Sequence, residues 1–237
     1  LNEEQFCITS GCQHALFLAI LCITKPGDNV AVESPAFYGV LQSLEQLSLN
    51  IIEIPSCAET GMDINALEQA LNKWPIKACI VTPSFATPTG ARMPLNKQKM
   101  LLNLAIKFDF TIIEDDIYGD MSFNGTLSPL KALDETGNVI LCGSMSKALS
   151  KDLRIGWIVG GKYQDRLIRL KLATSLASSK AHQQGLAMFM AEGGYRRHLQ
   201  QLVSALVRHK QQLIQAITSY LPEYIAYTNP EGGNSLW

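Results

Sequence analysis

The stretch TIIEDDIY, from Thr111 to Tyr118, is an apolar β-branched run followed at once by three acidic residues and, one residue later, a tyrosine. Threonine and isoleucine favour strands, and a continuous apolar run is typical of a strand that is buried on both faces. Ligands of open α/β folds bind just beyond the carboxyl ends of such strands. The stretch therefore predicts a strand over residues 111–114 that ends at a functional site.

Similar apolar runs recur along the chain and alternate with amphipathic segments. We predict strands at residues 29–32, 50–54, 78–82, 111–114, 139–142 and 157–159, and helices at 12–23, 37–47, 64–73 and 96–107. Asp63 is a candidate N-cap for the helix that follows it. Because parallel strands need helical crossovers, this alternation indicates a mostly parallel sheet with helices on both faces. The predicted fold class is α/β, with three layers in the order helix, sheet, helix.

The strand signal stops after Gly160, and we expect helix from there to Tyr220, including a long amphipathic helix at 195–220. A Pro-Glu-Gly-Gly turn at 230–233 leads into residues 234–237, which we predict to be the first strand of a new unit. The prediction divides the chain into a large domain at 1–192, a connecting helix at 193–221 and the start of a small domain at 222–237. Since the sequence opens without Met and without a leader, we expect a piece truncated at both ends.

Composition excludes several classes of protein. With 20 Lys+Arg against 21 Asp+Glu, the chain has no basic field for nucleic acid. Its 17% of charged residues is below the roughly 25% of an average soluble domain, which favours a sheet covered on both faces or a sizeable subunit interface. The longest apolar run, 15–23, is under half of the roughly 20 residues of a membrane span. Six cysteines without CxxC spacing indicate free thiols and a cytoplasmic protein, and the four histidines lack metal-ligand spacing.

Several short motifs favour other activities, but each lacks a part that its chemistry needs. Gly156 to Tyr163 resembles a phosphate-binding loop, yet Tyr163 stands where Mg²⁺ needs a Ser or Thr hydroxyl. Ser144 and Lys147 have the SxxK spacing of penicillin-binding enzymes, without the SDN and KTG elements. No GxGxxG occurs, so dinucleotide binding has no support. The acids at 114–116 are compatible with a glycosidase, a metal site or a nitrogen-heterocycle cofactor.

One combination of residues fits a phosphate that carries an aldehyde, as in pyridoxal phosphate (PLP). Gly11 opens a predicted helix, where free backbone N–H groups and the positive end of the helix dipole bind anions. Ser144, Ser146 and Arg154 supply two hydroxyls and a guanidinium that could anchor the phosphate. The amine of Lys147 then lies where it can form a Schiff base with the aldehyde.

Three further residues fit the ring of the same cofactor. A carboxylate at Asp115 keeps a pyridine nitrogen protonated, which makes the ring an electron sink. Tyr118 can donate to the phenolic oxygen, and Phe37 offers a flat face for stacking. The alternatives are ordinary core packing for Phe37 and Tyr118, and helix capping for Asp115.

Five segments together carry a resemblance to a known superfamily. TSGCQ at 9–13, ESPAFYG at 33–39, PTG at 88–90, IIEDDIY at 112–118 and SMSK at 144–147 with Arg154 resemble the fold type I aminotransferases, in order and nearly at their usual separations. Within that superfamily, residues 34–42 and 193–199 most resemble the aminotransferase-like domain of MocR-type transcription regulators of the GntR family. Those proteins carry a winged helix-turn-helix ahead of the domain.

The resemblance implies the large domain of the PLP-dependent transferase fold, PLP as cofactor, and a dimer with the pocket at the subunit interface. It implies catalytic roles for Lys147, as the Schiff-base residue, and for Asp115 and Tyr118, with Phe37 stacked on the ring and the phosphate held by Gly11, Cys12, Gln13, Ser144, Ser146 and Arg154. Two residues depart from the family pattern. Thr87 replaces the asparagine of Asn-Pro-Thr-Gly and gives Tyr118 a shorter hydroxyl partner, while the Cys12 thiol is a poor phosphate donor although its backbone N–H is unaffected.

Three functions remain open. The first is a regulator's sensor domain, in which PLP on Lys147 responds to an amine or amino acid and DNA is bound only by an N-terminal domain outside this chain. The second is an aminotransferase that moves an amino group from an amino acid to a 2-oxo acid, with Lys147 as acid and base. The third is a scaffold without cofactor, which a buried lysine beside a buried acid argues against. Thr87 favours the sensor.

Overall fold

A computed structural model, which describes residues 2–237, contains one eight-stranded sheet. Its strands are β1 Phe6–Thr9, β2 Asn29–Ser34, β3 Asn50–Cys57, β4 Gly61–Met62, β5 Ile76–Val81, β6 Thr111–Asp115, β7 Val139–Ser144 and β8 Gly156–Val159, in the spatial order β1-β8-β7-β6-β5-β2-β3-β4. β8 is antiparallel to β1 and β7, β4 is antiparallel to β3, and the other neighbours are parallel. The predicted mostly parallel sheet is confirmed.

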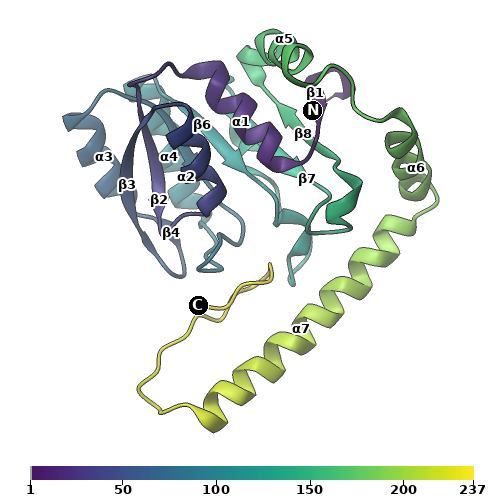
Figure 1. Ribbon diagram of the computed structural model, residues 1–237. Coiled ribbons are helices and arrows are strands. Elements are labelled where there is room, and N and C mark those ends of the chain that lie inside the picture. Colours follow the sequence, from purple (N-terminus) through teal and green to yellow (C-terminus); the bar gives the residue numbers. More distant parts are fainter. Residues whose placement is uncertain (1) are drawn as a thin grey trace.

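Helices cover both faces of the sheet (Figure 1). One face carries α1 Cys12–Ile23, α2 Tyr38–Gln46 and α5 Gln164–Ser175, and the other carries α3 Ile64–Lys73 and α4 Leu95–Phe108. Successive strand residues supply opposite cores: Val30 packs under α1 while Ala31 packs under α3 and α4. Because both faces are covered, the strands are continuously apolar, and the three-layer prediction is confirmed.

Local signals explain where two helices begin. The Asp63 carboxylate accepts hydrogen bonds from the backbone N–H groups of Asn65 and Ala66, which confirms it as the N-cap of α3. The N-cap of α1 is instead Gly11, whose φ of 92° lies in the region that favours glycine. Glycine has no side chain to cap the first turn, so backbone donors remain free there.

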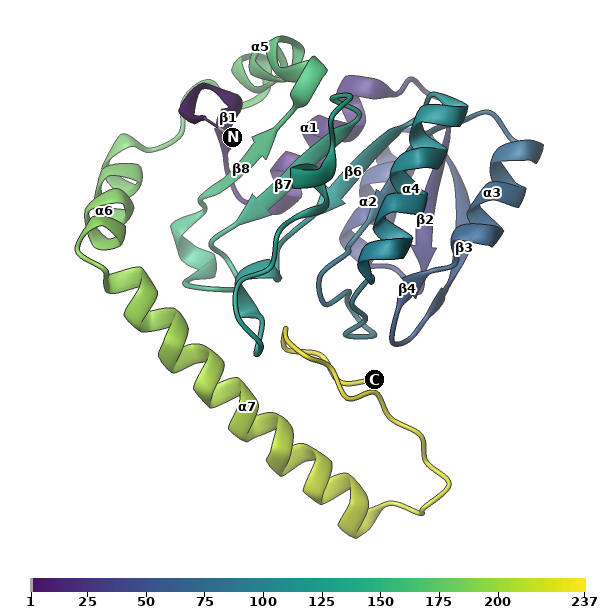
Figure 2. The same ribbon diagram turned by 180° about the vertical axis from the view of Figure 1, so that it is seen from behind.

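The helical region after Gly160 is interrupted twice. α5 is followed by α6 Lys180–Ala191 and by α7 Gly194–Tyr220, a helix of 27 residues. Only Gly194 and Tyr195 of α7 are buried, and the helix runs away from the sheet (Figure 2). None of the helices among residues 2–237 is both long and apolar enough to cross a membrane.

The predicted strand at 234–237 is wrong. Within the described chain these residues pair with no strand; instead the backbone of Trp237 bonds to Thr228, and the segment 228–237 loops back beneath the sheet edge (Figure 1). Two strands were not predicted. β1 has four residues with its first side chain exposed, and β4 has only two residues, too few to show a period.

Candidate functional site

The predicted site residues follow strands that end at one edge of the sheet. β2, β6 and β7 are parallel, and β1 runs in the same direction because β8 is antiparallel to both β1 and β7. Gly11 follows β1, Phe37 follows β2, Asp115 is the last residue of β6, and Ser144 is the last residue of β7. Segments up to 133 residues apart in the chain are thus collected at the carboxyl edge.

Four of these residues line one small cavity of about 30 Å³. Phe37, Thr87, Asp115 and Tyr118 contribute to its wall together with Thr82 and Ile117. The Thr87 hydroxyl donates to the Tyr118 hydroxyl at 2.9 Å, and Tyr118 is buried. Threonine therefore makes the contact to Tyr118 despite being shorter than asparagine, and the tyrosine keeps its own proton to donate.

Asp115 lies at the floor of this cavity and is only 6% exposed. The Cys12 thiol donates a hydrogen bond to its Oδ1 at 3.2 Å. Burial raises the pKa of Asp115 to about 6, while the bond from Cys12 and the charge of Lys147 lower it. At neutral pH the carboxylate is therefore mostly ionised in a dry environment, as a partner for a protonated ring nitrogen must be.

A cradle for an anion adjoins the start of α1. The Arg154 guanidinium donates to the backbone oxygen of Ser10 at 2.5 Å and lies over Gly11, where a Cβ atom would come within 2.6 Å of Nη2. The Ser144 and Ser146 hydroxyls are 2.7 Å apart. Together with the free N–H groups of the first helical turn, these donors fit a phosphate.

Lys147 occupies a turn that follows β7, and its side chain is exposed. The expectation of a buried lysine beside a buried acid is wrong, because the turn at 145–149 carries the side chain beyond the sheet edge. Its charge still acts on Asp115. The amine is therefore accessible and electrostatically coupled to the cavity floor.

Gln13 contributes to this region in a different way from the other predicted residues. Its side-chain amide donates to the backbone oxygen of Gly39 and to the Ser43 hydroxyl, both at 2.8 Å. The side chain thus ties α1 to α2. Only the backbone N–H of Gln13 remains for an anion at the helix start.

Comparison with known proteins shows which family has this sequence. The whole chain, residues 1–237, matches the family described as aminotransferase class I and II. The chain belongs to this family. It is 39% identical over 241 residues to the uncharacterized HTH-type transcriptional regulator YjiR of Escherichia coli strain K12, covering 100% of this chain and 51% of YjiR. It is 36% identical over 239 residues to YdcR of the same strain, another uncharacterized HTH-type transcriptional regulator, covering 100% of this chain and 51% of YdcR.

A solved aminotransferase has the same fold. Kynurenine aminotransferase of Pyrococcus horikoshii, solved in complex with PMP, superposes with a TM-score of 0.91 at 32% identity, covering 96% of this chain and 58% of the other. The resemblance stated from the motifs, including that to HTH-type regulators, is confirmed. The chain spans about half the length of the curated relatives it matches.

The long helix of this aminotransferase-family chain contacts the site at its first turns. The Tyr195 hydroxyl donates to Asp120 at 2.7 Å, two residues after Tyr118. His198 Nε2 lies 2.9 Å from the backbone oxygen of Ala148, the residue after Lys147. α7 is therefore attached to both loops that carry the predicted reactive side chains.

Glu33 is a buried acid to which the sequence analysis assigned no role. Its carboxylate accepts backbone N–H bonds from Met62 at 3.2 Å and from Thr82 at 2.9 Å. Burial raises its pKa to about 7, although both hydrogen bonds lower it. It joins β4 to the end of β5 and so fixes Thr82, which lines the small cavity. The sequence signal for this role was the position of Glu33 directly after the apolar residues of β2.

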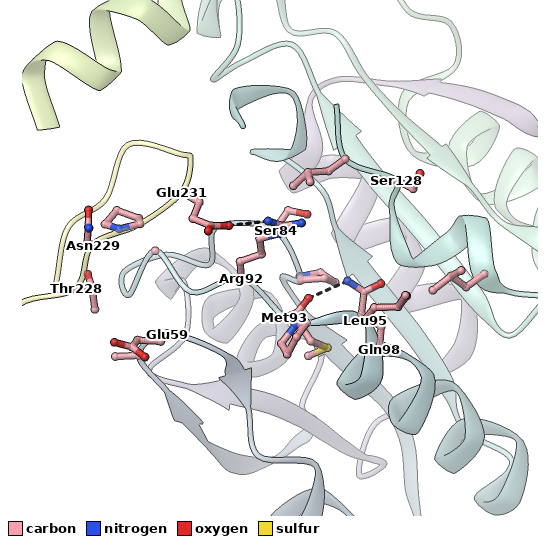
Figure 3. Close-up of a pocket in the computed structure, with 17 residues that line it drawn as sticks. Glu59, Ser84, Arg92, Met93, Leu95, Gln98, Ser128, Thr228, Asn229 and Glu231 are labelled. Carbon is pink, nitrogen blue, oxygen red and sulfur yellow. Dashed lines mark hydrogen bonds and ion pairs between the residues drawn. The ribbon is translucent and has the colours of Figure 1, made fainter. Parts of the chain in front are cut away.

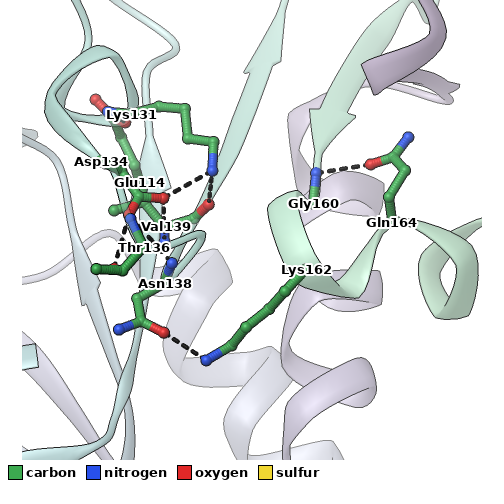
Figure 4. Close-up of polar contacts among 9 residues, drawn as sticks. All are labelled: Glu114, Lys131, Asp134, Thr136, Asn138, Val139, Gly160, Lys162 and Gln164. Carbon is green, nitrogen blue, oxygen red and sulfur yellow. Dashed lines mark hydrogen bonds and ion pairs between the residues drawn. The ribbon is translucent and has the colours of Figure 1, made fainter. Parts of the chain in front are cut away.

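Glu114, the last residue of the predicted strand at 111–114, lies within β6 and has a structural role (Figure 4). It accepts from the backbone N–H groups of Leu130 at 2.6 Å and Lys131 at 2.8 Å. Burial raises its pKa to about 8. Lys131 in turn donates to Asp134 and to the backbone oxygen of Val139. Residues 2–237 contain no cluster of His, Cys, Asp and Glu that could hold a metal.

A much larger cavity, about 670 Å³, lies elsewhere (Figure 3). It is formed by the loop after β5, the loop near Ser128 and the segment 228–231, which an ion pair between Arg92 and Glu231 joins at 2.6 Å. None of the predicted site residues lines it. The small cavity is therefore the candidate site, because a buried acid, paired hydroxyls and an aromatic ring converge there.

Proposed function

We propose that this chain is the PLP-binding, effector-sensing domain of a GntR/MocR-type transcription regulator, with the cofactor held as a Schiff base on Lys147. The observation that carries the proposal is the convergence of Phe37, Thr87, Asp115 and Tyr118 on one cavity at the carboxyl edge. Its identity of 39% and 36% to two HTH-type regulators supports the regulatory assignment. PMP in the kynurenine aminotransferase structure supports the choice of cofactor.

The side chains that border the small cavity suit the ring of PLP, which is larger than the cavity's volume of about 30 Å³, so binding requires these side chains to move apart. When bound, PLP supplies an aldehyde and an electron-withdrawing pyridine ring. Asp115 would accept a hydrogen bond from the protonated ring nitrogen, because its carboxylate is buried and mostly ionised at neutral pH. Tyr118, which accepts from Thr87, donates to the phenolic oxygen. Phe37 is half-buried and presents its ring to the same cavity.

The anion cradle suits the phosphate of the same molecule. The backbone N–H groups at Gly11, Cys12 and Gln13 open α1, where the helix dipole favours negative charge. The other proposed phosphate donors are the hydroxyls of Ser144 and Ser146 and the guanidinium of Arg154. Fixing the phosphate at this point leaves the aldehyde end of the molecule for the exposed amine of Lys147.

Signal output in this proposal runs through α7. An amino acid that took the place of Lys147 on the cofactor would release the lysine amine and leave the turn at 145–149 free to move. His198 contacts the backbone of that turn, and Tyr195 contacts the loop of Tyr118. A change at the site therefore reaches the first turns of a 27-residue helix, which we assign to the connecting segment 193–221.

An active aminotransferase is the second candidate. The exposed Lys147 amine supports it, because a lysine free to move can take a proton from a substrate carbon and return it elsewhere. The 32% identity to kynurenine aminotransferase also supports it. In this case the site turns amino donor and 2-oxo acid over repeatedly, and Thr87 is a functional substitute for asparagine.

A spectroscopic experiment separates the two candidates. PLP is added to the protein, its visible absorption is followed as amino acids are added, and keto acid is assayed in the same sample. Displacement of the lysine-bound form without keto acid supports the sensor, whereas steady keto acid production supports the enzyme. A chain that forms no lysine-bound form with PLP contradicts both.

Assembly and location follow from the same proposal. We propose a homodimer, supported by large apolar side chains that are exposed on α5, at its C-cap and on α6: Ile168, Leu172, Leu176 and Met188. DNA binding is assigned to an N-terminal domain outside this chain, as the relatives' names favour. All six cysteines are free and five are buried, which supports a reducing, cytoplasmic setting. A sizing column on the longer protein tests the dimer.

A further inference from the structure

We propose that Cys12 is a positioning residue of the cofactor site, whose thiol donates the hydrogen bond that holds the Asp115 carboxylate at the floor of the cavity. This inference rests on the proposed function, because it assigns Asp115 to the ring nitrogen. It also gives the residue a role different from phosphate binding by its side chain.

The geometry of the pair carries the inference. Cys12 Sγ lies 3.2 Å from Asp115 Oδ1, a short distance for a sulfur donor, and the two residues are 103 positions apart in the chain. Both are almost fully buried, with exposures of 4% and 6%. Cys12 is the first residue of α1, and Asp115 is the last residue of β6. The bond therefore joins the helix that opens the anion cradle to the strand that ends at the cavity.

The chemistry of the thiol suits this role. Burial, and then the charge of Asp115, raise the pKa of Cys12 well above its usual range, so the group stays a protonated donor. A neutral thiol adds no second negative charge beside the carboxylate. A buried carboxylate without a donor is costly, and hydrogen bonds to its charged form favour that form.

One residue thus serves both ends of the proposed cofactor. The backbone N–H of Cys12 lies in the first turn of α1, facing the phosphate cradle, while its side chain turns inward to Asp115. Cys12 thus sets the spacing between the proposed phosphate partners at the start of α1 and the Asp115 carboxylate. A serine at position 12 would keep a hydrogen-bond donor, but its C–O bond is shorter than the C–S bond of cysteine, so its hydroxyl would lie farther from Asp115.

Several other groups face Asp115 and must be kept constant in a test. They are Cys142, its partner on β7, the charge of Lys147 in the following turn, Asp116 next along the chain, and Glu33 from β2. None of these is changed by a substitution at Cys12. A titration of Asp115 therefore reports on the thiol.

The test compares C12A, C12S and C22A in the 237-residue chain. Cys22 is fully buried on the same helix, so C22A is a matched control for loss of a buried sulfur. The titration of the Asp115 carboxyl carbon is followed by NMR without cofactor, with D115N to identify the signal. In C12A, loss of a hydrogen bond to a charged group should raise the titration midpoint of Asp115 by about one pH unit. In C12S and C22A the midpoint should stay close to that of the native chain.

PLP affinity is measured on the same variants. C12A is expected to bind several-fold more weakly than C22A. A C12A midpoint equal to that of C22A overturns the inference. Failure of the proposed function has a different signature: a native chain that takes up no PLP contradicts that function, while a raised midpoint in the same samples still supports the Cys12–Asp115 contact.

Discussion

The carboxyl edge above β6 and β7 differs sharply from the long helix α7. At the edge, Asp115 and Glu114 are buried and each has a hydrogen-bond partner. Along α7, which lies apart from the sheet (Figure 2), only Gly194 and Tyr195 are buried, and the remaining residues are half-buried or exposed. The buried acids at the edge are held by their hydrogen-bond partners, whereas a helix with few attachments can change position without unfolding the sheet.

The attachments of α7 lie near its first turns and toward its far end. Tyr195 and His198 contact the site loops, and Lys210 donates to Asn229 and to the backbone oxygen of Pro230, both at 3.0 Å. Substitutions at the edge should therefore change cofactor binding, and substitutions on the helix should change coupling with little effect on binding.

The largest effect is expected at Asp115. D115N removes the charge that pairs with the ring nitrogen, so PLP affinity should fall by roughly tenfold to a hundredfold, as expected for about 1.5–3 kcal/mol. Because the Asp115 pKa is raised to about 6, affinity in the native chain should weaken as pH falls through that value and Asp115 is protonated.

The matched control for this prediction is D116N, which changes the adjacent acid, a residue that does not line the cavity. Affinity is measured by titrating PLP and following its visible band between pH 5 and 8. Equal affinities of D115N and D116N would contradict the assignment, as would a D115N affinity that keeps the native pH dependence.

Arg154 comes next. R154A removes the guanidinium over Gly11 and should weaken PLP binding about tenfold, with little change for pyridoxal, which lacks the phosphate. R154K keeps the positive charge without the planar fork, so its PLP affinity should lie between those of the native chain and R154A. R92A is the control, since Arg92 pairs with Glu231 outside the site. A similar loss for PLP and pyridoxal would show that the effect is structural.

A smaller effect is expected for the hydroxyl pair. Y118F removes the donor to the phenolic oxygen and T87V removes the bond to Tyr118, so each should raise the pH midpoint of the bound cofactor's visible band. The shift should be larger in Y118F, because T87V leaves one hydroxyl in place. An unchanged midpoint in Y118F would remove Tyr118 from the site.

The buried acids of the edge should also make stability depend on pH. Folding raises the pKa of Glu33 to about 7 and of Glu114 to about 8 from 4.5, so the folded chain binds more protons than the unfolded chain between these values. Their contribution to stability is therefore fully present below about pH 4.5 and decreases as pH rises toward 8. Thermal unfolding across this range measures it, and E114Q should flatten the curve. An unfolding temperature that rises toward pH 8 in both the native chain and E114Q would contradict this prediction.

The smallest effect on binding is expected on α7. H198A removes the contact with the Ala148 oxygen and should change PLP affinity by less than about twofold, while amide exchange at the start of α7 becomes faster because one hydrogen bond, worth about 1 kcal/mol, is lost. H209A, farther along the helix, is the control. Loss of PLP binding in H198A would mean that α7 is part of the cofactor site and not a coupling element.

The sequence predicted the layers and the edge well for physical reasons. Strands buried on both faces are continuous apolar runs, and their parallel direction places Asp115 and Ser144 at one edge. The sequence-based prediction failed where contacts with distant residues determine the structure. Residues 234–237 would need a partner strand to form a strand, and β4 is too short to show a periodic pattern. Neither the exposure of Lys147 nor the turn of the Cys12 thiol toward Asp115 is visible in spacing, because both depend on side-chain directions set by packing.

The most direct test of the account is chemical trapping on Lys147. The chain is mixed with PLP, reduced with borohydride, digested and analysed by mass spectrometry, alongside K147A and, as an exposed neighbour, K151A. The account predicts one reduced adduct on the peptide that contains Lys147, present in K151A and lost in K147A. An adduct spread over other surface lysines, or unchanged in K147A, would contradict the assignment of this edge as a PLP site.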